Sequence, residues 1–335
     1  MDLKVGINGF GRIGRYCLRI ILDRKNIDVV AVNSRAESRV LAHLLKYDSI
    51  HGVYDKEIKY DDNSITVDGK KIAIVRETGD LAKIGWGDLG ADIVLESTGK
   101  FRKRAEAEGH LAAGAKKVLI AAPGKDVDST IVIGVNEDIY DPKSHHVISN
   151  ASCTTNCLAP VVKIINDGFG IERGLMTTVH SYTMDQRILD GSHKDLRRGR
   201  AAALSIVPTT TGAAAAVSLV IPELSGKLDG MALRVPTPNV SLIDFTAQLS
   251  KEAGADEINK AVKSAADGKM KGIVKYTDEE LVSIDYQSSP YSSIFDAKLT
   301  SVIKGGLVKV IAWYDNESGY SERLVDLAGY VGEKL

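Results

Sequence analysis

Cysteine is scarce in this chain of 335 residues, which contains three: Cys17, Cys153 and Cys157. Three thiols cannot build the disulfide framework that stabilises many small secreted domains. A charge excess is also missing, since 43 Lys and Arg against 44 Asp and Glu give a formal net charge of −1. A general nucleic-acid or anionic-membrane binder needs a basic excess. We therefore expect a protein of a reducing compartment, the cytoplasm, with no nucleic acid as its primary partner.

Long hydrophobic runs are absent as well. The first four residues, 1–4, lack the apolar run of a signal peptide. One uncharged stretch, 201–221, carries Pro208, three threonines and Gly212 at its centre. Such residues are typical of a turn followed by a short helix rather than of a transmembrane span. We expect no membrane segment.

Proline is rare too, with 8 residues against 31 glycines, which favours an α/β protein with many short turns. Charged residues make up 26% and hydrophobic residues 44% of the chain, an ordinary globular composition that excludes wholesale disorder. The length is typical of two domains.

The first half of the chain alternates strand and helix patterns. An apolar segment, 3–7, precedes a helical pattern that begins at Arg12, and a second apolar segment follows at 28–33. This β-α-β unit has the length of a parallel crossover. Its continuation predicts a Rossmann-type doubly wound parallel sheet. The further elements that we expect are strands at 93–97, 117–121 and 146–149 and a helix at 102–113.

The pattern changes near residue 150. After a helix that starts near Cys153, longer alternating runs predict a largely antiparallel sheet with one covered face, and thus a second, α+β catalytic domain. A long polar segment, 182–204, interrupts these runs, and inserts of that length are usually functional or disordered. We expect one domain over 1–149 with the C-terminal helix 316–335, and another over 150–315. The alternating runs are 173–181, 229–235, 240–248 and 307–314, and a last helix is expected at 319–333.

A glycine motif joins the first strand to the first helix. In this context the pattern GxGxxG predicts a dinucleotide site, with the pyrophosphate at the helix N-terminus. The first glycine permits the tight turn, the second lets the backbone approach the ligand, and the third allows close helix packing. The alternative is a glycine-rich turn without a ligand. The motif consists of Gly9, Phe10, Gly11, Arg12, Ile13 and Gly14.

The residue that normally holds the adenine ribose is an acid about twenty positions beyond these glycines. Counting from Gly14 reaches Ser34, which Arg35 follows. A carboxylate would repel a 2′-phosphate, whereas a serine beside an arginine would accept one. This position favours NADP over NAD, with NAD use possible. The alternative is that Arg35 is simply solvated.

A strand-to-helix junction places Cys153 at or near a helix N-terminus, which favours a thiolate. From the residues alone, Cys153 is either a nucleophile or a structural thiol. Cys157, one turn deeper, is better explained as a buried apolar residue. A nucleophile needs a base, and among seven histidines His180 ends an alternating run, although no spacing rule selects it. No metal-ligand spacing is present, so we expect no metal.

Eight segments together resemble phosphorylating glyceraldehyde-3-phosphate dehydrogenases. The resemblance is collinear and covers nearly the whole chain. The segments are INGFGRIGR (7–15), HLLKYDSIHG (43–52), SNASCTTNC (149–157), HSYT (180–183), HKDLRRGRAA (193–202), PTTTGAA (208–214), LRVPTPNVS (233–241) and WYDNESGYS (313–321).

The resemblance implies a role for each matching residue. Cys153 attacks the aldehyde, and His180 serves as the base. Asn316 is similar to the residue that holds the nicotinamide carboxamide. The substrates implied are glyceraldehyde 3-phosphate and inorganic phosphate, which attacks the resulting thioester to form 1,3-bisphosphoglycerate. Residues that match the site of the attacking phosphate are Ser152, Thr154, Thr211 and Gly212, and those that match the substrate-phosphate site or lie between the two are Thr183, Arg198 and Arg234.

The sequence departs from the family pattern at three places. The common acid is replaced by Ser34, and the Leu-Pro frequent in NAD-type relatives is replaced by Gly191–Ser192. In the photosynthetic NADP-using branch, a serine at the position of Ser192 reaches the 2′-phosphate from a neighbouring subunit. Ser318 stands where the family usually has tryptophan.

The family further implies a homotetramer and a place in glycolysis and gluconeogenesis. The basic run at 193–200 is then better explained by phosphate binding and subunit contact than by nucleic acid. Two alternatives remain: an erythrose-4-phosphate dehydrogenase, against which Thr183, Arg198, Thr211 and Arg234 argue, and a non-catalytic binding protein, against which Cys153 and His180 argue.

Overall fold

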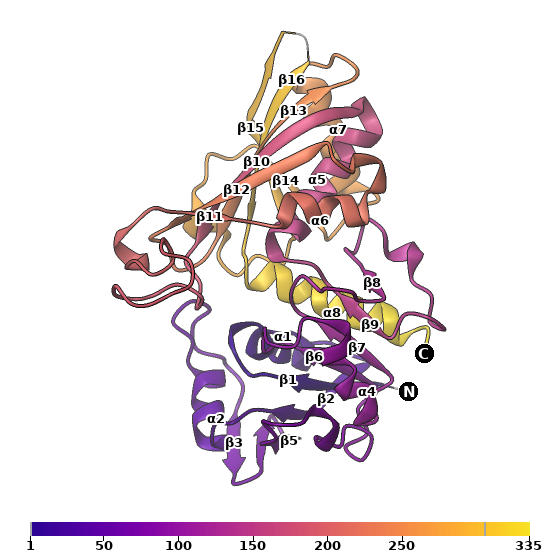
Figure 1. The fold of residues 1–335 in the computed structure, drawn as a ribbon, viewed down its shortest axis with the longest axis vertical. Helices are drawn as coiled ribbons and strands as arrows, with labels where there is room; N and C mark the ends of the chain where they lie inside the picture. Colours follow the sequence, from indigo (N-terminus) through magenta and orange to yellow (C-terminus); the bar gives the residue numbers. More distant parts are fainter. Residues whose placement is uncertain (1, 305) are drawn as a thin grey trace. The chain divides into compact units, whose positions relative to one another are not determined.

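The computed structural model describes residues 2–304 and 306–335, which form two compact units (Figure 1). Unit 1 contains residues 2–131, 137–151 and 321–335. Unit 2 contains residues 132–136, 152–304 and 306–320. Met1 and Gly305, which fall inside the predicted domain ranges, lie outside the described residues.

The sheet of unit 1 is mostly parallel. Its strands are β1 (Leu3–Asn8), β2 (Ile27–Asn33), β3 (Ile58–Asp61), β4 (Ser64–Val67), β5 (Lys70–Val75), β6 (Ile93–Glu96), β7 (Lys117–Ile120), β8 (Ser129–Thr130) and β9 (Val147–Ser149). They are ordered β3-β4-β5-β2-β1-β6-β7-β9-β8, and only the pairs β3–β4 and β4–β5 are antiparallel among the described residues. Every residue of β6 and β7 is buried, as expected for a parallel sheet covered on both faces. The predicted doubly wound Rossmann sheet is confirmed.

Helix α1 (Arg12–Asp23) follows the glycine motif directly and buries its Cys17, Leu18, Ile20 and Ile21 face. The helix predicted over 102–113 is wrong as a single element. It consists of two short helices, separated at Glu108, because the next residue, Gly109, is a poor helix former. These are α3 (Arg104–Ala107) and α4 (Gly109–Ala112), and the other helices with residues in unit 1 are α2 (Ser38–Lys46) and α8 (Ser318–Gly332).

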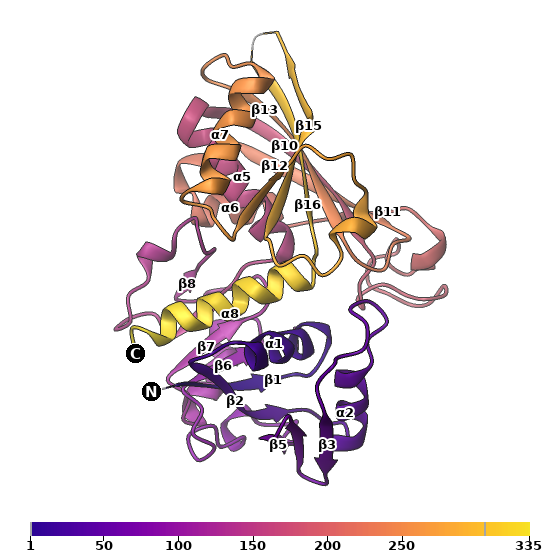
Figure 2. The ribbon, with the colours of Figure 1, turned by 180° about the vertical axis from the view of Figure 1, so that it is seen from behind.

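The sheet of unit 2 is largely antiparallel, as predicted. Its strands are β10 (Ile171–Ser181), β11 (Val207–Thr210), β12 (Leu228–Val235), β13 (Ser241–Leu249), β14 (Val274–Thr277), β15 (Ser293–Ile303) and β16 (Leu307–Tyr314), ordered β11-β12-β10-β13-β16-β15-β14. In β13 buried and half-buried residues alternate along the strand, which is typical of one covered face. Figure 2 shows the helices α5 (Cys153–Phe169), α6 (Ala213–Val220) and α7 (Ala255–Asp267) gathered on that face.

Two pairs of strands in this sheet are parallel, β14 with β15 and β10 with β12, and the second pair joins two runs that the sequence analysis placed in an antiparallel sheet. Strands β10 and β12 run parallel, with His180 opposite Arg234 in the register. The connection between them contains β11 and α6 and is long enough for the crossover that parallel pairing requires. The alternating pattern of side chains is the same for both orientations, so it could not reveal this pair.

Candidate active site

The glycine turn of unit 1 has the geometry that a pyrophosphate needs. Gly9 adopts a positive φ of 93°, which few other residues accept. A Cβ at Gly11 would meet nothing within 4 Å, whereas a Cβ at Gly14 would lie 2.2 Å from the Gly9 carbonyl oxygen. No side chain caps the N-terminus of α1, so its first N–H groups are offered to a ligand. These observations fit a dinucleotide.

The other residues of this motif have different surroundings. Phe10 is 6% exposed, and Ile13 is half-buried. The guanidinium of Arg12 makes a bidentate pair with Asp48, through Nη1–Oδ2 and Nη2–Oδ1 contacts of 2.5 and 3.0 Å. The charge of Arg12 is therefore already balanced within unit 1.

Ser34 and Arg35 lie directly after β2, where the sequence analysis places the ribose contact. The Ser34 N–H donates to the Val75 carbonyl at 2.9 Å. Arg35 is exposed and forms no ion pair with any described residue. Its charge is available to a phosphate.

A buried polar network lies beneath the turn, and the sequence analysis missed it. Asn8, Asn33 and Glu96 are the last residues of β1, β2 and β6. The Asn33 amide donates to Asn8 Oδ1 at 2.7 Å, and the Asn8 amide donates to Glu96 Oε2 at 2.5 Å. Carboxyl ends of parallel strands meet at one edge of a sheet, so three polar strand ends in a row were the available signal.

Glu96 is 1% exposed and collects further donors. The Thr98 N–H donates to Oε1 at 2.8 Å, and His110 Nε2 lies 3.0 Å from Oε2. The indole N–H of Trp86 donates to His110 Nδ1 at 2.9 Å, which leaves the ring proton on Nε2, facing the carboxylate. The network fixes the loop that contacts Gly9.

In unit 2 the first residue of α5, Cys153, meets the end of β10. Cys153 Sγ lies 3.5 Å from His180 Nε2. Ser152 caps the helix, because its Oγ accepts from the Thr155 N–H at 3.0 Å. Cys153 is partly exposed and His180 is 3% exposed. Two residues 27 apart in sequence thus form the candidate nucleophile–base pair.

Burial opposes a charge on both members of this pair. Burial and the charges of Arg234 and Arg198 together lower the pKa of His180 to about 3, which favours the neutral ring. Burial also raises the pKa of the Cys153 thiol, with Arg234 the largest opposing influence. Burial thus opposes the thiolate that the helix N-terminus favours, whereas the charge of Arg234 supports it.

Arg234 lies directly beside His180 because β10 and β12 pair in parallel at these residues. Its Nη1 is 2.7 Å from His180 Nδ1 and donates to the Ser181 carbonyl at 3.2 Å. His180 Nδ1 is itself 2.7 Å from that carbonyl oxygen. The arginine predicted to bind phosphate is thus in contact with the predicted base.

Tyr314 is a second residue that the sequence analysis missed, although it lies within the 313–321 segment. Its buried hydroxyl is 2.9 Å from both Thr154 Oγ1 and Thr178 Oγ1. Its ring meets the His180 ring edge-on at 5.9 Å between centroids. Tyr314 ties the first turn of α5 to the strand that carries the base.

The remaining predicted ligands of unit 2 are placed as follows. Arg198 pairs with Asp185 at 2.9 Å and with Asp195 at 3.4 Å. Thr211 Oγ1 accepts from the Ala213 N–H at 3.2 Å, and exposed Gly212 precedes α6 without a side-chain cap. Thr154 is 4% exposed, and its hydroxyl is already paired with the Tyr314 hydroxyl at 2.9 Å.

Unit 2 also contains three further predicted ligands and Ser318. Thr183 is half-buried, and its N–H donates to Gln186 Oε1 at 3.4 Å. Ser192 is exposed in the long loop. Asn316 is 8% exposed, and its Oδ1 accepts from the Ser241 hydroxyl at 2.9 Å. Buried Ser318 donates its N–H to Asp315 Oδ1, and nothing in the structure explains the loss of tryptophan there.

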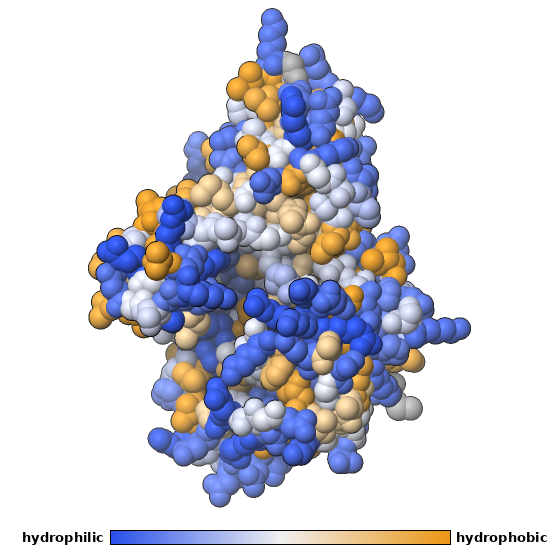
Figure 3. Space-filling model, viewed as in Figure 1, coloured by the Kyte–Doolittle hydropathy of each residue, from blue (hydrophilic) through white to orange (hydrophobic). Residues whose placement is uncertain are grey.

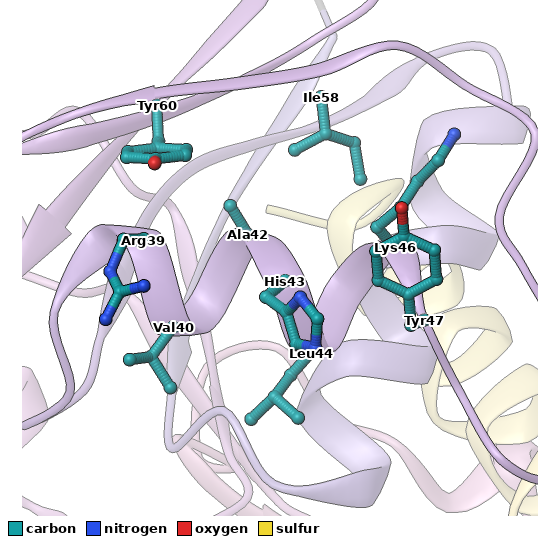
Figure 4. Close-up of a pocket in the computed structure, with 9 residues that line it drawn as sticks. All are labelled: Arg39, Val40, Ala42, His43, Leu44, Lys46, Tyr47, Ile58 and Tyr60. Atoms are coloured by element: carbon teal, nitrogen blue, oxygen red, sulfur yellow. The ribbon is translucent and has the colours of Figure 1, made fainter.

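A surface hollow of about 610 Å³ in unit 1 has none of these residues in its lining (Figure 4). It contains no predicted catalytic or phosphate ligand, so it does not mark the site. It is lined by Arg39, Val40, Ala42, His43, Leu44, Lys46, Tyr47, Ile58 and Tyr60.

Across residues 2–304 and 306–335, no helix is both long and apolar enough to cross a membrane. Within the same ranges, no three His, Cys, Asp or Glu side chains are grouped to hold a metal ion.

Comparison with known proteins gives consistent matches. Residues 3–104 match the NAD binding domain of glyceraldehyde 3-phosphate dehydrogenase, and residues 152–316 match its C-terminal domain. The chain is 61% identical over 334 residues to a glyceraldehyde-3-phosphate dehydrogenase of Geobacillus stearothermophilus, covering 100% of this chain and 99% of the relative. It is 60% identical to glyceraldehyde-3-phosphate dehydrogenase 1 of Bacillus subtilis with the same coverage, and 57% identical to a Streptomyces coelicolor relative over the full length of both chains.

Proposed function

The chain belongs to the glyceraldehyde-3-phosphate dehydrogenase family, and on that premise we propose that it catalyses the phosphate-dependent, reversible oxidation of glyceraldehyde 3-phosphate to 1,3-bisphosphoglycerate. The observation that carries the proposal is the Cys153–His180 pair at the N-terminus of α5, with Arg234 beside it. A thiol, a base and a cation in contact are what covalent chemistry on a phosphorylated aldehyde needs.

Cys153 Sγ attacks the aldehyde carbon while the thiol proton passes to His180 Nε2. The imidazolium returns that proton to the developing alkoxide, which gives the thiohemiacetal. In the oxidation His180 takes the hydroxyl proton as the C–H bond breaks, and the bound nicotinamide serves as the hydride acceptor. A phosphate oxygen then attacks the thioester carbon, and the Cys153 thiolate leaves. A neutral His180 supports the base role.

Two groups of residues would hold the two phosphates. We assign Thr183, Arg198 and Arg234 to the C3 phosphate of the substrate or to the region between the sites. Backbone N–H groups and hydroxyls at Ser152, Thr154, Thr211 and Gly212 would hold the attacking phosphate. Because the Thr154 hydroxyl is bound to Tyr314, its contribution would come from the backbone N–H.

The cofactor would be held by unit 1 through the glycine turn, with the pyrophosphate at the start of α1. Asn316 would contact the nicotinamide carboxamide through its amide nitrogen, since its Oδ1 is occupied by Ser241. We accordingly assign cofactor binding to residues 1–149 with 316–335, and catalysis to 150–315.

The cofactor would be NADP in preference to NAD, with NAD still used. Ser34 supplies a hydroxyl without a repelling charge, and Arg35 is exposed without an ion-pair partner among the described residues. Ser192 would add a second hydroxyl from a neighbouring subunit. A 2′-phosphate needs such donors and cations.

The assembly would be a homotetramer. Large apolar side chains are exposed on the 182–206 loop of unit 2, seen as orange patches beside blue at the left of Figure 3. Light scattering of the purified protein tests this, since the tetramer has about four times the chain mass of 36.0 kDa. The exposed residues are Met184, Ile188, Leu189, Leu196, Leu204 and Ile206.

The experiment that tests the function is a set of initial rates with glyceraldehyde 3-phosphate and erythrose 4-phosphate, each with NAD or NADP, with and without inorganic phosphate. We expect the triose phosphate to be preferred and steady turnover to require phosphate. A preference for erythrose 4-phosphate, or phosphate-independent turnover, would replace this proposal with the related dehydrogenase. Absence of turnover with both cofactors would indicate a binding protein.

A further inference from the structure

A buried serine hydroxyl lies between two strands that lead to the site in unit 2. Ser241 is the first residue of β13, which pairs with β10 on one side and with β16 on the other. It is 2% exposed. Its oxygen accepts from the Ser181 N–H at 3.0 Å, and its proton is donated to Asn316 Oδ1 at 2.9 Å. One hydroxyl thus joins the neighbour of His180 to the residue assigned to the nicotinamide.

These two hydrogen bonds determine which way the amide of Asn316 faces. A backbone N–H only donates, so Ser181 occupies a lone pair of the Ser241 hydroxyl and leaves its proton for Asn316. The hydroxyl has no other hydrogen-bond partner among the described residues. Turning the amide over would point its N–H groups at Ser241 and leave the buried hydroxyl proton unpaired, which is unfavourable. Asn316 therefore keeps Oδ1 toward Ser241.

The backbone around Asn316 is fixed as well, so only its side-chain amide remains to be oriented. Asp315 is 1% exposed. Its Oδ1 accepts from the N–H groups of Glu317 and Ser318 at 2.8 and 2.7 Å, and its Oδ2 accepts from the Asn239 amide at 2.7 Å. No residue within 2–304 or 306–335 hydrogen-bonds to Asn316 Nδ2, so its N–H groups are available to a ligand.

The backbone that leads into Ser241 is strained. Val240 has a φ of 66°, which is unfavourable for a β-branched residue. Val240 is 3% exposed, and its carbonyl oxygen accepts from the Ser181 hydroxyl at 2.7 Å. Strain of this kind persists only where the surrounding structure over-determines the conformation, and it is concentrated at functional sites. The fold therefore holds Ser241 in place against a local cost.

We propose that Ser241 is a positioning residue for the nicotinamide, which fixes Asn316 so that an N–H donor, and not the amide oxygen, meets the carboxamide of the cofactor. The inference rests on the proposed function in one respect, since it takes Asn316 as the ligand of that carboxamide. A carboxamide has an oxygen that accepts and an NH₂ group that donates. A fixed N–H donor selects the oxygen, so the carboxamide binds in one orientation rather than two. Ser241 itself acts only through Asn316.

The test is a double-mutant cycle on cofactor binding by the full-length protein, with Ser241→Ala, Asn316→Ala and the double variant. The ligand is NADPH, followed by its fluorescence, and the reference ligand is 2′-phospho-ADP-ribose, which lacks the nicotinamide. NADH and ADP-ribose form a second pair, so the result does not depend on the preference for NADP. Ser264→Ala, which removes an exposed hydroxyl of unit 2, is the control and should bind every ligand as the unmodified protein does.

We expect Ser241→Ala to weaken NADPH binding by about three- to tenfold, the effect of losing a neutral hydrogen bond, and to leave binding of the reference ligand unchanged. The double variant should bind NADPH as weakly as Asn316→Ala does, because residues that act as one unit are not additive. A general structural role of Ser241 would instead weaken both ligands.

The proposal is overturned if Ser241→Ala binds NADPH normally, weakens both ligands equally, or adds to the loss in Asn316→Ala. Asn316→Asp decides the matter where Ser241→Ala fails to fold, because it keeps an acceptor for Ser241 but replaces the N–H donor with an oxygen. It should bind NADPH as weakly as Asn316→Ala, and normal affinity would overturn the proposal. Turnover of the unmodified protein separates the two proposals. An active enzyme with an additive cycle contradicts this inference alone, whereas the expected cycle in a protein without dehydrogenase activity contradicts the proposed function alone.

Discussion

Single residues differ in reactivity because their burial differs, and the three cysteines are the clearest case. Cys17 and Cys157 are fully buried, and burial raises the pKa of both thiols, that of Cys17 to about 12. Cys153 is partly exposed and lies beside a neutral imidazole and a guanidinium. Access and a nearby base thus distinguish one thiol of the three.

Stoichiometric iodoacetamide should therefore label Cys153 first and abolish activity. Peptide mapping by mass spectrometry after partial reaction measures the order of labelling. Cys153→Ser is the control, which should be inactive and should take up the label only slowly. Earlier labelling of Cys157, or full activity in Cys153→Ser, would contradict the assignment.

His180 should make the folded state sensitive to mild acid. Its pKa falls from 6.5 to about 3 on folding, so the unfolded chain binds one more proton between these values. Stability then rises with pH across that window by about 1.4 kcal/mol per pH unit and is lost as pH falls below 6.5. Urea unfolding at pH 7 and pH 5 should show a smaller loss for His180→Asn than for the unmodified protein. Equal losses in both would refute a neutral, buried His180.

Ser34 should control the choice of cofactor. Ser34→Asp places a carboxylate where a 2′-phosphate would bind, and losing a charged contact worth about 1.5–3 kcal/mol corresponds to roughly ten- to a hundredfold in affinity. The ratio of kcat/KM for NADP to that for NAD should fall accordingly. Ser264→Asp, on an exposed face of α7 in unit 2, is the control and should leave the ratio unchanged. An unmodified enzyme that strongly prefers NAD would contradict the argument from Ser34, Arg35 and Ser192.

At the scale of elements, buried parallel strands and amphipathic helices could be predicted because their periodicity is local. The β1–α1–β2 unit lies within a few residues of its predicted bounds. Strands β3 and β4 escaped prediction because each has only four residues, and β5 escaped although its last four residues are apolar. The parallel pairing of β10 with β12 also escaped, since orientation depends on a connection rather than on a pattern.

The candidate site, too, was predicted only where local sequence features mark its residues. Cys153 and the glycine turn stand at strand–helix junctions, which the sequence reveals. Tyr314 could not be found in this way, because its role depends on partners brought together by the fold. The same holds for Arg234, whose contact with His180 exists only in the parallel register.

The two glycines of the turn should respond differently to alanine. Gly14→Ala places a methyl group 2.2 Å from the Gly9 carbonyl oxygen, so the backbone must shift and the melting temperature should fall. Gly11→Ala has open space and should fold normally, yet its methyl group would obstruct the pyrophosphate and weaken dinucleotide binding. Gly168→Ala, also in open space but within α5, should not lower the melting temperature and should leave dinucleotide binding unchanged. Thermal melts and titration with NADP measure both, and normal cofactor affinity in Gly11→Ala would contradict the assignment of the turn.

At the scale of the whole molecule, one chain combines a dinucleotide-binding fold with a thiol–imidazole pair in a second fold. This combination suits an oxidation that stores its energy in a covalent bond to the protein. A thioester on Cys153 would persist until phosphate attacks it, so the two halves of the reaction can be separated by withholding phosphate. The proposed function therefore requires this intermediate to form on Cys153.

The most direct measurement is therefore intact-protein mass spectrometry after mixing the enzyme with glyceraldehyde 3-phosphate and NADP in a buffer free of phosphate. The account predicts one acyl group per chain, mapped to Cys153, formed with one equivalent of reduced cofactor. Addition of phosphate should remove it as 1,3-bisphosphoglycerate. Reduced cofactor formed without an acyl adduct, or an adduct on a residue other than Cys153, would contradict the account.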